Sequence, residues 1–167
     1  PGGCSIGARK VDLHLEALQA MGASIELRDG YVHASAPNGL KGAEIDFPFV
    51  SVGATENSLC AAVLAKGTTV LKNVAREPDT VALAHCLMAM GADIEGAGTS
   101  TIVIEGVSEL HPADHRVVPD RLEAGTYIVA GAMTGGTVTV RDCVPQHLRM
   151  ELSKLQDAGV DVSTGDD

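Results

Sequence analysis

The first group in the chain that could do chemistry is a cysteine that follows two glycines and precedes an arginine. Gly2, Gly3, Cys4 and Arg9 stand just before a stretch with helical periodicity. A thiolate is stabilised by a nearby cation and by free N–H groups at a helix N-terminus, and glycines let the backbone approach a ligand closely. The pattern is typical of a reactive thiol. The spacing is equally compatible with Cys4 being a small buried apolar residue after a turn.

Other segments place small, polar or acidic residues where helices are expected to start. Residues 51–55 (Ser-Val-Gly-Ala-Thr) could hold an anion on backbone N–H groups, although Ser51 and Thr55 could simply cap the helix. Glu77 lies between Arg76 and Pro78 at a second start. Asp120 lies at a third, where an acidic group also favours the positive end of the helix dipole.

The histidines and cysteines do not predict a metal site. His85 lies on an expected apolar helix face and is interpreted as a core residue, whereas His14 could face either ligand or solvent. Neither the remaining histidines nor the four cysteines have ligand-like spacing, and there is no C-x-x-C. We therefore expect no metal and no disulfide framework, and a reduced, cytoplasmic setting.

The charge balance excludes several classes of partner. The formal net charge is −10 without a run of Lys or Arg, which argues against nucleic acid or an anionic membrane. No stretch of 18 apolar residues is present, so we expect no membrane insertion. With no Trp, two Phe and two Tyr, the core must be aliphatic, and aromatic stacking on bases is not expected.

A repeat runs through the chain with a period close to 69 residues. A helical stretch ending in glycine and followed by a short strand recurs at Gly22, Gly91 and Gly159, which are 69 and 68 residues apart. A second marker, a glycine before an alternating Thr/Val stretch, recurs 69 residues apart at Gly67 and Gly136. This period is longer than that of common solenoids and indicates a compact unit duplicated in a globular protein.

Local signals give a full unit the order β-α-β-α-β-β, and the first unit lacks its first helix. The first unit has a helix from about residue 11, a hairpin turning at 29–30 and a strand near 43–47. The second has a helix ending near 67, a strand at 68–71, a helix from 78, and strands near 92–95 and 101–105. The third has a helix at 122–133, a strand at 137–141, a helix ending at 159 and a strand near 160–162. The pattern predicts that the last unit stops before its final strands, and that the chain is truncated.

These motifs together resemble the UDP-N-acetylglucosamine enolpyruvyl transferase family over essentially the whole chain. The matching segments are residues 1–9 (Pro-Gly-Gly-Cys-Ser-Ile-Gly-Ala-Arg) with 11–14, then 50–55, 75–78 and 119–126. The cysteine segment is the discriminating part, because the related shikimate-pathway enzyme lacks it. The resemblance implies an α/β (α+β) fold, the inside-out α/β barrel of two lobes built from repeated β-α-β-α-β-β units. Residues 1–117 would be most of the cysteine-loop lobe, and 118–167 the start of the second lobe.

The resemblance also implies roles for individual residues. Cys4 matches the cysteine that adds to phosphoenolpyruvate, is proposed to protonate its methylene carbon and is alkylated by fosfomycin. Arg9 matches an arginine that contacts phosphate. The uridine pocket corresponds to Val11, Asp12 and Leu13, and the backbone cradle for the UDP part to Ser51, Val52 and Gly53; Glu77 and Asp120 are supporting residues.

Two positions depart from the family pattern. Lys10 stands where proline is usual, and Phe49 stands where many members carry a lysine near the UDP phosphates. We therefore expect phosphate binding to depend on Arg9 and on backbone N–H groups. The positions of the family's Lys-Asn pair and its general-base aspartate fall outside these 167 residues.

The function implied is transfer of the enolpyruvyl group of phosphoenolpyruvate to the 3-hydroxyl of UDP-N-acetylglucosamine, with release of phosphate. This is the first committed step of peptidoglycan synthesis, tied to cell-wall biogenesis, cell shape and division, and it needs no cofactor. The alternatives are a non-catalytic UDP-sugar-binding module and, ranked last because of Cys4, a shikimate-pathway enzyme. For the isolated chain we expect little or no turnover.

Overall fold

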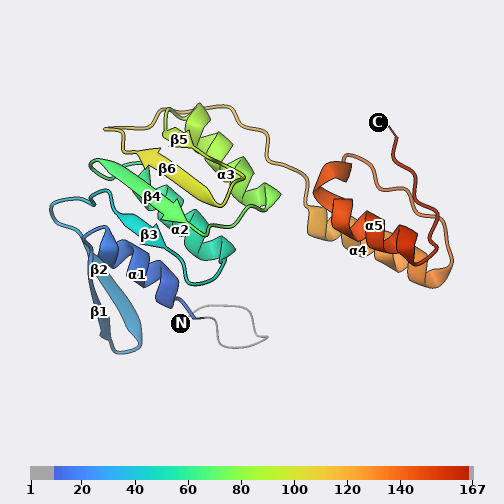
Figure 1. Ribbon diagram of the computed structural model, residues 1–167, viewed down its shortest axis with the longest axis horizontal. Coiled ribbons are helices and arrows are strands. Elements are labelled where there is room, and N and C mark those ends of the chain that lie inside the picture. Colours follow the sequence, from blue (N-terminus) through green and yellow to red (C-terminus); the bar gives the residue numbers. More distant parts are fainter. Residues whose placement is uncertain (1–9, 166–167) are drawn as a thin grey trace. The chain divides into compact units, whose positions relative to one another are not determined.

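The computed structural model describes residues 10–165. The described chain forms two compact units, one ending at Arg116 and the other beginning at Val117 (Figure 1). The assignment of the chain to two lobes stays a prediction.

The first unit is built on a four-stranded sheet in the order β3-β4-β6-β5 (Figure 1). Its strands are β3 (Glu44–Asp46), β4 (Thr68–Lys72), β5 (Asp93–Glu95) and β6 (Thr101–Glu105). β4 pairs in parallel with β3 and antiparallel with β6, and β5 pairs antiparallel with β6. All four strands were expected from the alternation of apolar and polar residues.

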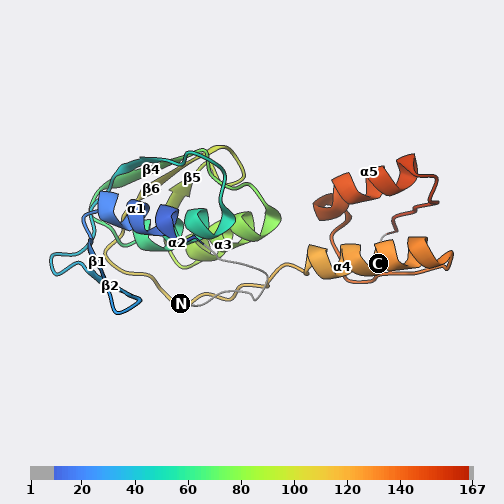
Figure 2. The ribbon, with the colours of Figure 1, turned by 90° about the horizontal axis from the view of Figure 1, so that it is seen from below.

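Three helices cover one face of this sheet: α1 (Asp12–Ala20), α2 (Val52–Ala62) and α3 (Pro78–Ala89) (Figure 2). Every second strand residue points into the core they enclose, as the period of a strand requires. The buried strand residues are Ile45, Thr69, Leu71, Ile94, Ile102 and Ile104. Beneath the helices the core is aliphatic, as the composition predicts, with Phe47 as the one aromatic residue in the cluster of described buried residues.

A hairpin of β1 (Ser24–Arg28) and β2 (Tyr31–Ser35) forms a separate two-stranded sheet. Its turn places Asp29 at φ 53° and Gly30 at φ 79°. Both central residues thus have positive φ, which is the type I′ geometry favoured by Asp-Gly. The expected hairpin is confirmed.

The expectation that His85 is a core residue is wrong. The buried positions of α3 are Thr80, Ala84 and Leu87, whereas His85 is exposed. One residue corresponds to about 100° around a helix, so the residue after Ala84 turns away from the apolar stripe. The apolar face expected from the sequence included His85 and therefore lay one residue too far toward the C-terminus.

The second unit contains α4 (Arg121–Thr134), the 3-10 turn η1 (Pro145–Leu148) and α5 (Arg149–Asp157). The helices agree with the expectation, but the strands expected at 137–141 and 160–162 do not form. In the first unit the corresponding strands, β4 and β5, do not pair with each other but both pair with the central strand β6. Up to residue 165 no later segment takes the place of β6, so the two extended segments have no ladder to join.

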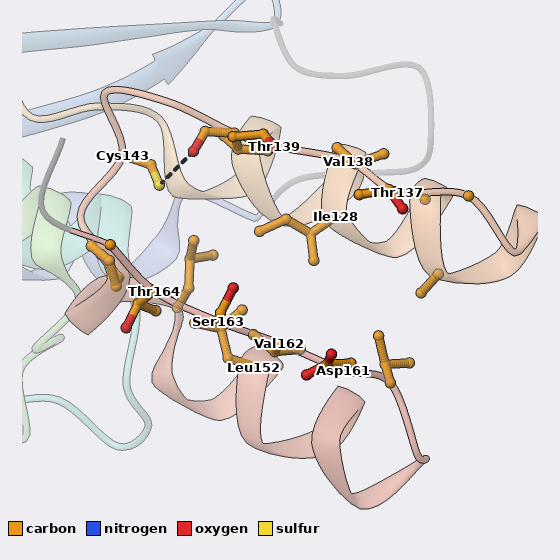
Figure 3. A pocket seen from close by; sticks show the side chains of 18 of the residues that line it. Ile128, Thr137, Val138, Thr139, Cys143, Leu152, Asp161, Val162, Ser163 and Thr164 are labelled. Atoms are coloured by element: carbon orange, nitrogen blue, oxygen red, sulfur yellow. Dashed lines mark hydrogen bonds between the residues drawn. The ribbon is translucent and has the colours of Figure 1, made fainter.

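These unpaired segments border a groove in the second unit (Figure 3). Ile128 of α4 and Val138 line one side of it, and Leu152 of α5 and Val162 line the other. Its volume is about 760 Å³.

Candidate functional site

The N-terminal turns of α1, α2 and α3 lie side by side at one edge of the first unit. His14 of α1 packs against Gly53 of α2, and Thr80 of α3 donates a hydrogen bond of 3.3 Å to Glu56 of α2. This edge also carries the loops that leave the carboxyl ends of the parallel strands β3 and β4. Ligands of open α/β sheets bind at such edges, and several helix N-termini pointing the same way favour an anion.

The opposite ends of the helices confirm that they run in parallel. The backbone carbonyl of Met21, just after α1, accepts from Lys41 N–H, and Lys66 N–H, beyond α2, donates to Leu40 of the same segment. The chain after β6 likewise meets the ends of α2 and α3, through Val107 N–H on the Val63 carbonyl and His111 N–H on the Met90 carbonyl. The helix dipoles are therefore aligned.

Ser51 is the N-cap residue of α2. Its Oγ accepts a hydrogen bond of 3.3 Å from Ala54 N–H, so Ser51 does cap the helix as one interpretation of the sequence suggested. The cap satisfies only one of the first N–H groups, and helix geometry leaves those of Val52 and Gly53 without an intrahelical acceptor. Gly53 is exposed. Capping and anion binding are thus compatible roles for this segment.

Two hydrogen bonds fix the loops on either side of this helix start. Thr55 is fully buried; its Oγ1 donates to the Ser51 carbonyl at 2.8 Å and accepts from Ala75 N–H at 3.0 Å. Asn73, in the left-handed conformation at φ 54°, donates from Nδ2 to the Phe47 carbonyl at 2.8 Å. These bonds tie the loop before α2 to the loop before α3.

The residues expected to line a uridine pocket lie at the start of α1. Val11 is the N-cap residue and Asp12 is in the first turn, and both are exposed. Leu13 is 6% exposed and belongs to the hydrophobic core, so only its backbone is available to a ligand. Residues 11–13 and 51–53 therefore lie at the same edge. Val11 and Asp12 expose their side chains there, whereas Leu13 offers only its backbone.

The two expected supporting residues lie at other helix starts. Glu77 is the N-cap residue of α3 without a capping side-chain bond, and its Oε2 is buried with no hydrogen-bond partner among the described residues. Asp120 belongs to the second unit, where its Oδ1 accepts from Leu122 N–H at 2.8 Å and Glu123 N–H at 3.2 Å. Asp120 is thus the N-cap of α4, which places its carboxylate at the positive end of the helix dipole.

Cys4 and Arg9 lie outside the described residues. Of the remaining cysteines, Cys60, Cys86 and Cys143 are free thiols. Partial burial of its sulfur, together with the negative charge of Glu56, raises the pKa of the Cys60 thiol. Cys60 is therefore a poor nucleophile at neutral pH.

Both departures from the family pattern are at the surface. Lys10 is exposed, and Phe49 is 59% exposed just before the Ser51 cap. In residues 10–165, no three His, Cys, Asp or Glu side chains are grouped so as to hold a metal ion. Within the same residues, no helix is both long and apolar enough to span a membrane.

Sequence reasoning missed the residues that hold the site together. The Asn73 bond depends on a left-handed residue, which only the Asn preference for that conformation could have suggested. The pairs His14–Gly53 and Thr80–Glu56 join different helices and leave no local signal. They follow from the packing of α1, α2 and α3.

The first unit thus belongs to the class of open α/β domains, whose ligands bind at the carboxyl edge of the parallel strands. The chain belongs to the family described as EPSP synthase (3-phosphoshikimate 1-carboxyvinyltransferase), whose sequence model matches residues 1–167.

Curated relatives within this family are close in sequence. The UDP-N-acetylglucosamine 1-carboxyvinyltransferase of Jannaschia sp. (strain CCS1) is 59% identical over 166 residues, 99% of this chain and 39% of the relative. The protein of the same name from Dinoroseobacter shibae is 62% identical over 163 residues, 98% and 39% respectively. The chain thus spans about two fifths of the length of these relatives.

Solved structures confirm the expected fold class. The enolpyruvyl transferase NikO from Streptomyces tendae superposes with a TM-score of 0.81 at 27% identity, covering 96% of this chain and 41% of that one. EPSP synthase from Acinetobacter baumannii gives a TM-score of 0.60 at 26% identity, over 75% of this chain and 28% of that one. The chain has the α/β fold of enolpyruvyl transferases.

Proposed function

We propose that this chain is part of an enzyme that transfers the enolpyruvyl group of phosphoenolpyruvate to the 3-hydroxyl of UDP-N-acetylglucosamine. The observation that carries the proposal is the His14–Gly53 contact, which brings residues 11–13 and residues 51–53 to the same edge of the unit. By resemblance these are the two segments that bind UDP. The 59–62% identity to proteins named for this reaction adds support.

In this proposal the start of α2 holds the diphosphate. The N–H groups of Val52 and Gly53 point out of the helix, and the Ser51 cap and the Thr55 bonds keep the loop in place. Charge-assisted hydrogen bonds from backbone N–H groups are stronger than neutral ones. Phe49 carries no charge, so in this proposal Arg9 supplies the positive charge for the diphosphate. The backbone of residues 11–13 binds the uridine.

Cys4 supplies the acid. In the addition step the sugar 3-hydroxyl oxygen forms a bond to C2 of phosphoenolpyruvate, a base takes the hydroxyl proton, and the Cys4 thiol gives a proton to the C3 methylene. In the elimination step the Cys4 thiolate takes a proton back from C3, the C2–C3 double bond re-forms, the bond from C2 to the phosphate oxygen breaks, and phosphate leaves. Arg9 offsets the charge on phosphate. Fosfomycin would alkylate Cys4, and the product would serve peptidoglycan synthesis in the cytoplasm.

A chimeric enzyme tests the proposal. The matching 166 residues of the Jannaschia relative are replaced by this chain, and phosphate release from phosphoenolpyruvate and UDP-N-acetylglucosamine is measured. We expect turnover that depends on both substrates, and its loss on Cys4→Ala together with loss of fosfomycin labelling. Unchanged turnover with retained labelling in the Cys4→Ala chimera would contradict the role of Cys4.

Calorimetry separates the enzyme from a non-catalytic module. UDP-N-acetylglucosamine is titrated into the 167-residue chain and into the chimera. Binding by both, with phosphate release by the chimera, supports the enzyme. Binding with no release by a folded chimera favours the UDP-sugar-binding module, and binding of shikimate 3-phosphate instead would point to the shikimate-pathway reaction.

A further inference from the structure

The contact between His14 and Gly53 links the first turns of α1 and α2. A Cβ placed on Gly53 would lie 3.2 Å from His14 Cε1 and 3.4 Å from His14 Nε2. The first distance is tighter than nine in ten real Cβ contacts, so a side chain at position 53 requires the imidazole or the helix to shift by a few tenths of an ångström. The imidazole of His14 thus packs against the backbone of α2 at Gly53, which has no side chain.

The two residues form the outer rim of a fixed pair of helices. Leu13, beside His14, and Ala54, beside Gly53, are buried in one hydrophobic cluster. The Ser51 side chain caps α2 at this end. At the surface, above this core, the imidazole lies between the two first turns.

We propose that His14 is a positioning residue for the ligand site. It sets the spacing between the backbone of residues 11–13 and the N–H groups of Val52 and Gly53. This inference rests on the proposed function, in which a nucleoside diphosphate spans the two segments. A rigid ligand that makes contacts on both sides gains from a spacing fixed in advance, since less conformational freedom is lost on binding. Gly53 is then glycine because the imidazole occupies the space of its side chain.

A cycle of thermal unfolding tests the contact without any ligand. The unaltered 167-residue chain is compared with Gly53→Ala, His14→Ala and the double variant. Alanine is a better helix former than glycine, so Gly53→Ala should raise Tm by about 2 °C where nothing opposes it. We expect that rise in the His14→Ala background and a fall in Tm where His14 is present. Equal shifts in both backgrounds would overturn the proposal.

Matched variants serve as controls for the cycle of thermal-unfolding measurements. Asn57→Ala changes an exposed residue further along α2 and should shift Tm equally in both backgrounds. His14→Gln keeps a flat polar side chain and should retain the penalty of Gly53→Ala. It also replaces His14→Ala in the cycle if that variant fails to fold.

Calorimetry with two probes then tests the positioning role. UDP spans both segments, whereas inorganic pyrophosphate needs only the start of α2. We expect His14→Ala to weaken UDP binding about tenfold and pyrophosphate binding less than about threefold, with His14→Gln recovering most of the loss. Equal losses for both probes would show that His14 contacts phosphate directly and would overturn the positioning role.

Failure of the proposed function has a different signature. If the unaltered chain binds pyrophosphate but not UDP, the proposed nucleotide site is wrong, and the positioning of a nucleotide falls with it. The Tm cycle needs no ligand, so it still decides whether His14 sets the spacing of α1 and α2.

Discussion

Thr55 Oγ1 accepts a hydrogen bond of 3.0 Å from Ala75 N–H and so joins the helix that begins at Ser51 to the loop that leads into α3. The same hydroxyl donates to the Ser51 carbonyl at 2.8 Å. One buried side chain thus holds two loops of the candidate site together, and it does so between residues 20 positions apart in the sequence.

Thr55→Val should destabilise the first unit. The substitution keeps the shape of the side chain but leaves a buried N–H and a carbonyl without this partner, which costs about 1–3 kcal/mol. Urea unfolding measures the change, and Thr55→Ser is the control because it keeps the hydroxyl. A Thr55→Val variant as stable as the unaltered chain would contradict the bridging role.

Substitutions at Asn73 separate the energetic cost of its left-handed backbone from that of its lost hydrogen bond. Asn73→Gly keeps easy access to φ 54° but loses the bond to the Phe47 carbonyl, which costs about 1 kcal/mol. Asn73→Ala loses the bond and also places a Cβ in the left-handed region, which adds about 1–2 kcal/mol. The free energy of unfolding should therefore fall in the order Asn, Gly, Ala. Equal stability of the Gly and Ala variants would show that the conformation carries no strain.

The reactivity of Cys60 should rise only above the ordinary pH range of thiols. Burial and the charge of Glu56 raise its pKa, so less thiolate is present at any given pH. In a chain with serine at positions 4, 86 and 143, the rate of iodoacetamide labelling followed against pH gives the titration. Glu56→Gln should move the midpoint down only in part, because burial is the larger cause. A midpoint that does not respond to Glu56→Gln would contradict the charge effect.

Phe49→Lys should strengthen binding of UDP to the chain. Phe49 is exposed just before the Ser51 cap, and a cation there adds attraction for the diphosphate. We expect roughly a threefold to tenfold gain at low salt that shrinks near 0.5 M salt, where the Debye length is only about 3–8 Å. Phe49→Met, which adds no charge, is the control. Equal affinities for the Lys and Met variants would place the diphosphate elsewhere.

The sequence by itself determined the local elements of the first unit and the family. Helix starts at Ser51 and Pro78, the Asp29–Gly30 turn and the alternation in β4 and β6 all depend on neighbouring residues, so they can be read along the chain. A helix start also indicated an anion site at residues 51–55, whereas residues 11–13 were assigned to a ligand pocket only through the resemblance to the family.

Tertiary structure decided what those signals leave open. Strand propensity at 137–141 did not become a strand, because a ladder needs a partner and the described second unit offers none. His85 turned out exposed, because the orientation of α3 is set by packing and not by its own weak apolar pattern. The contact of His14 with Gly53 and the bond of Thr55 to Ala75 join residues far apart in sequence, and such pairs form only when the chain folds.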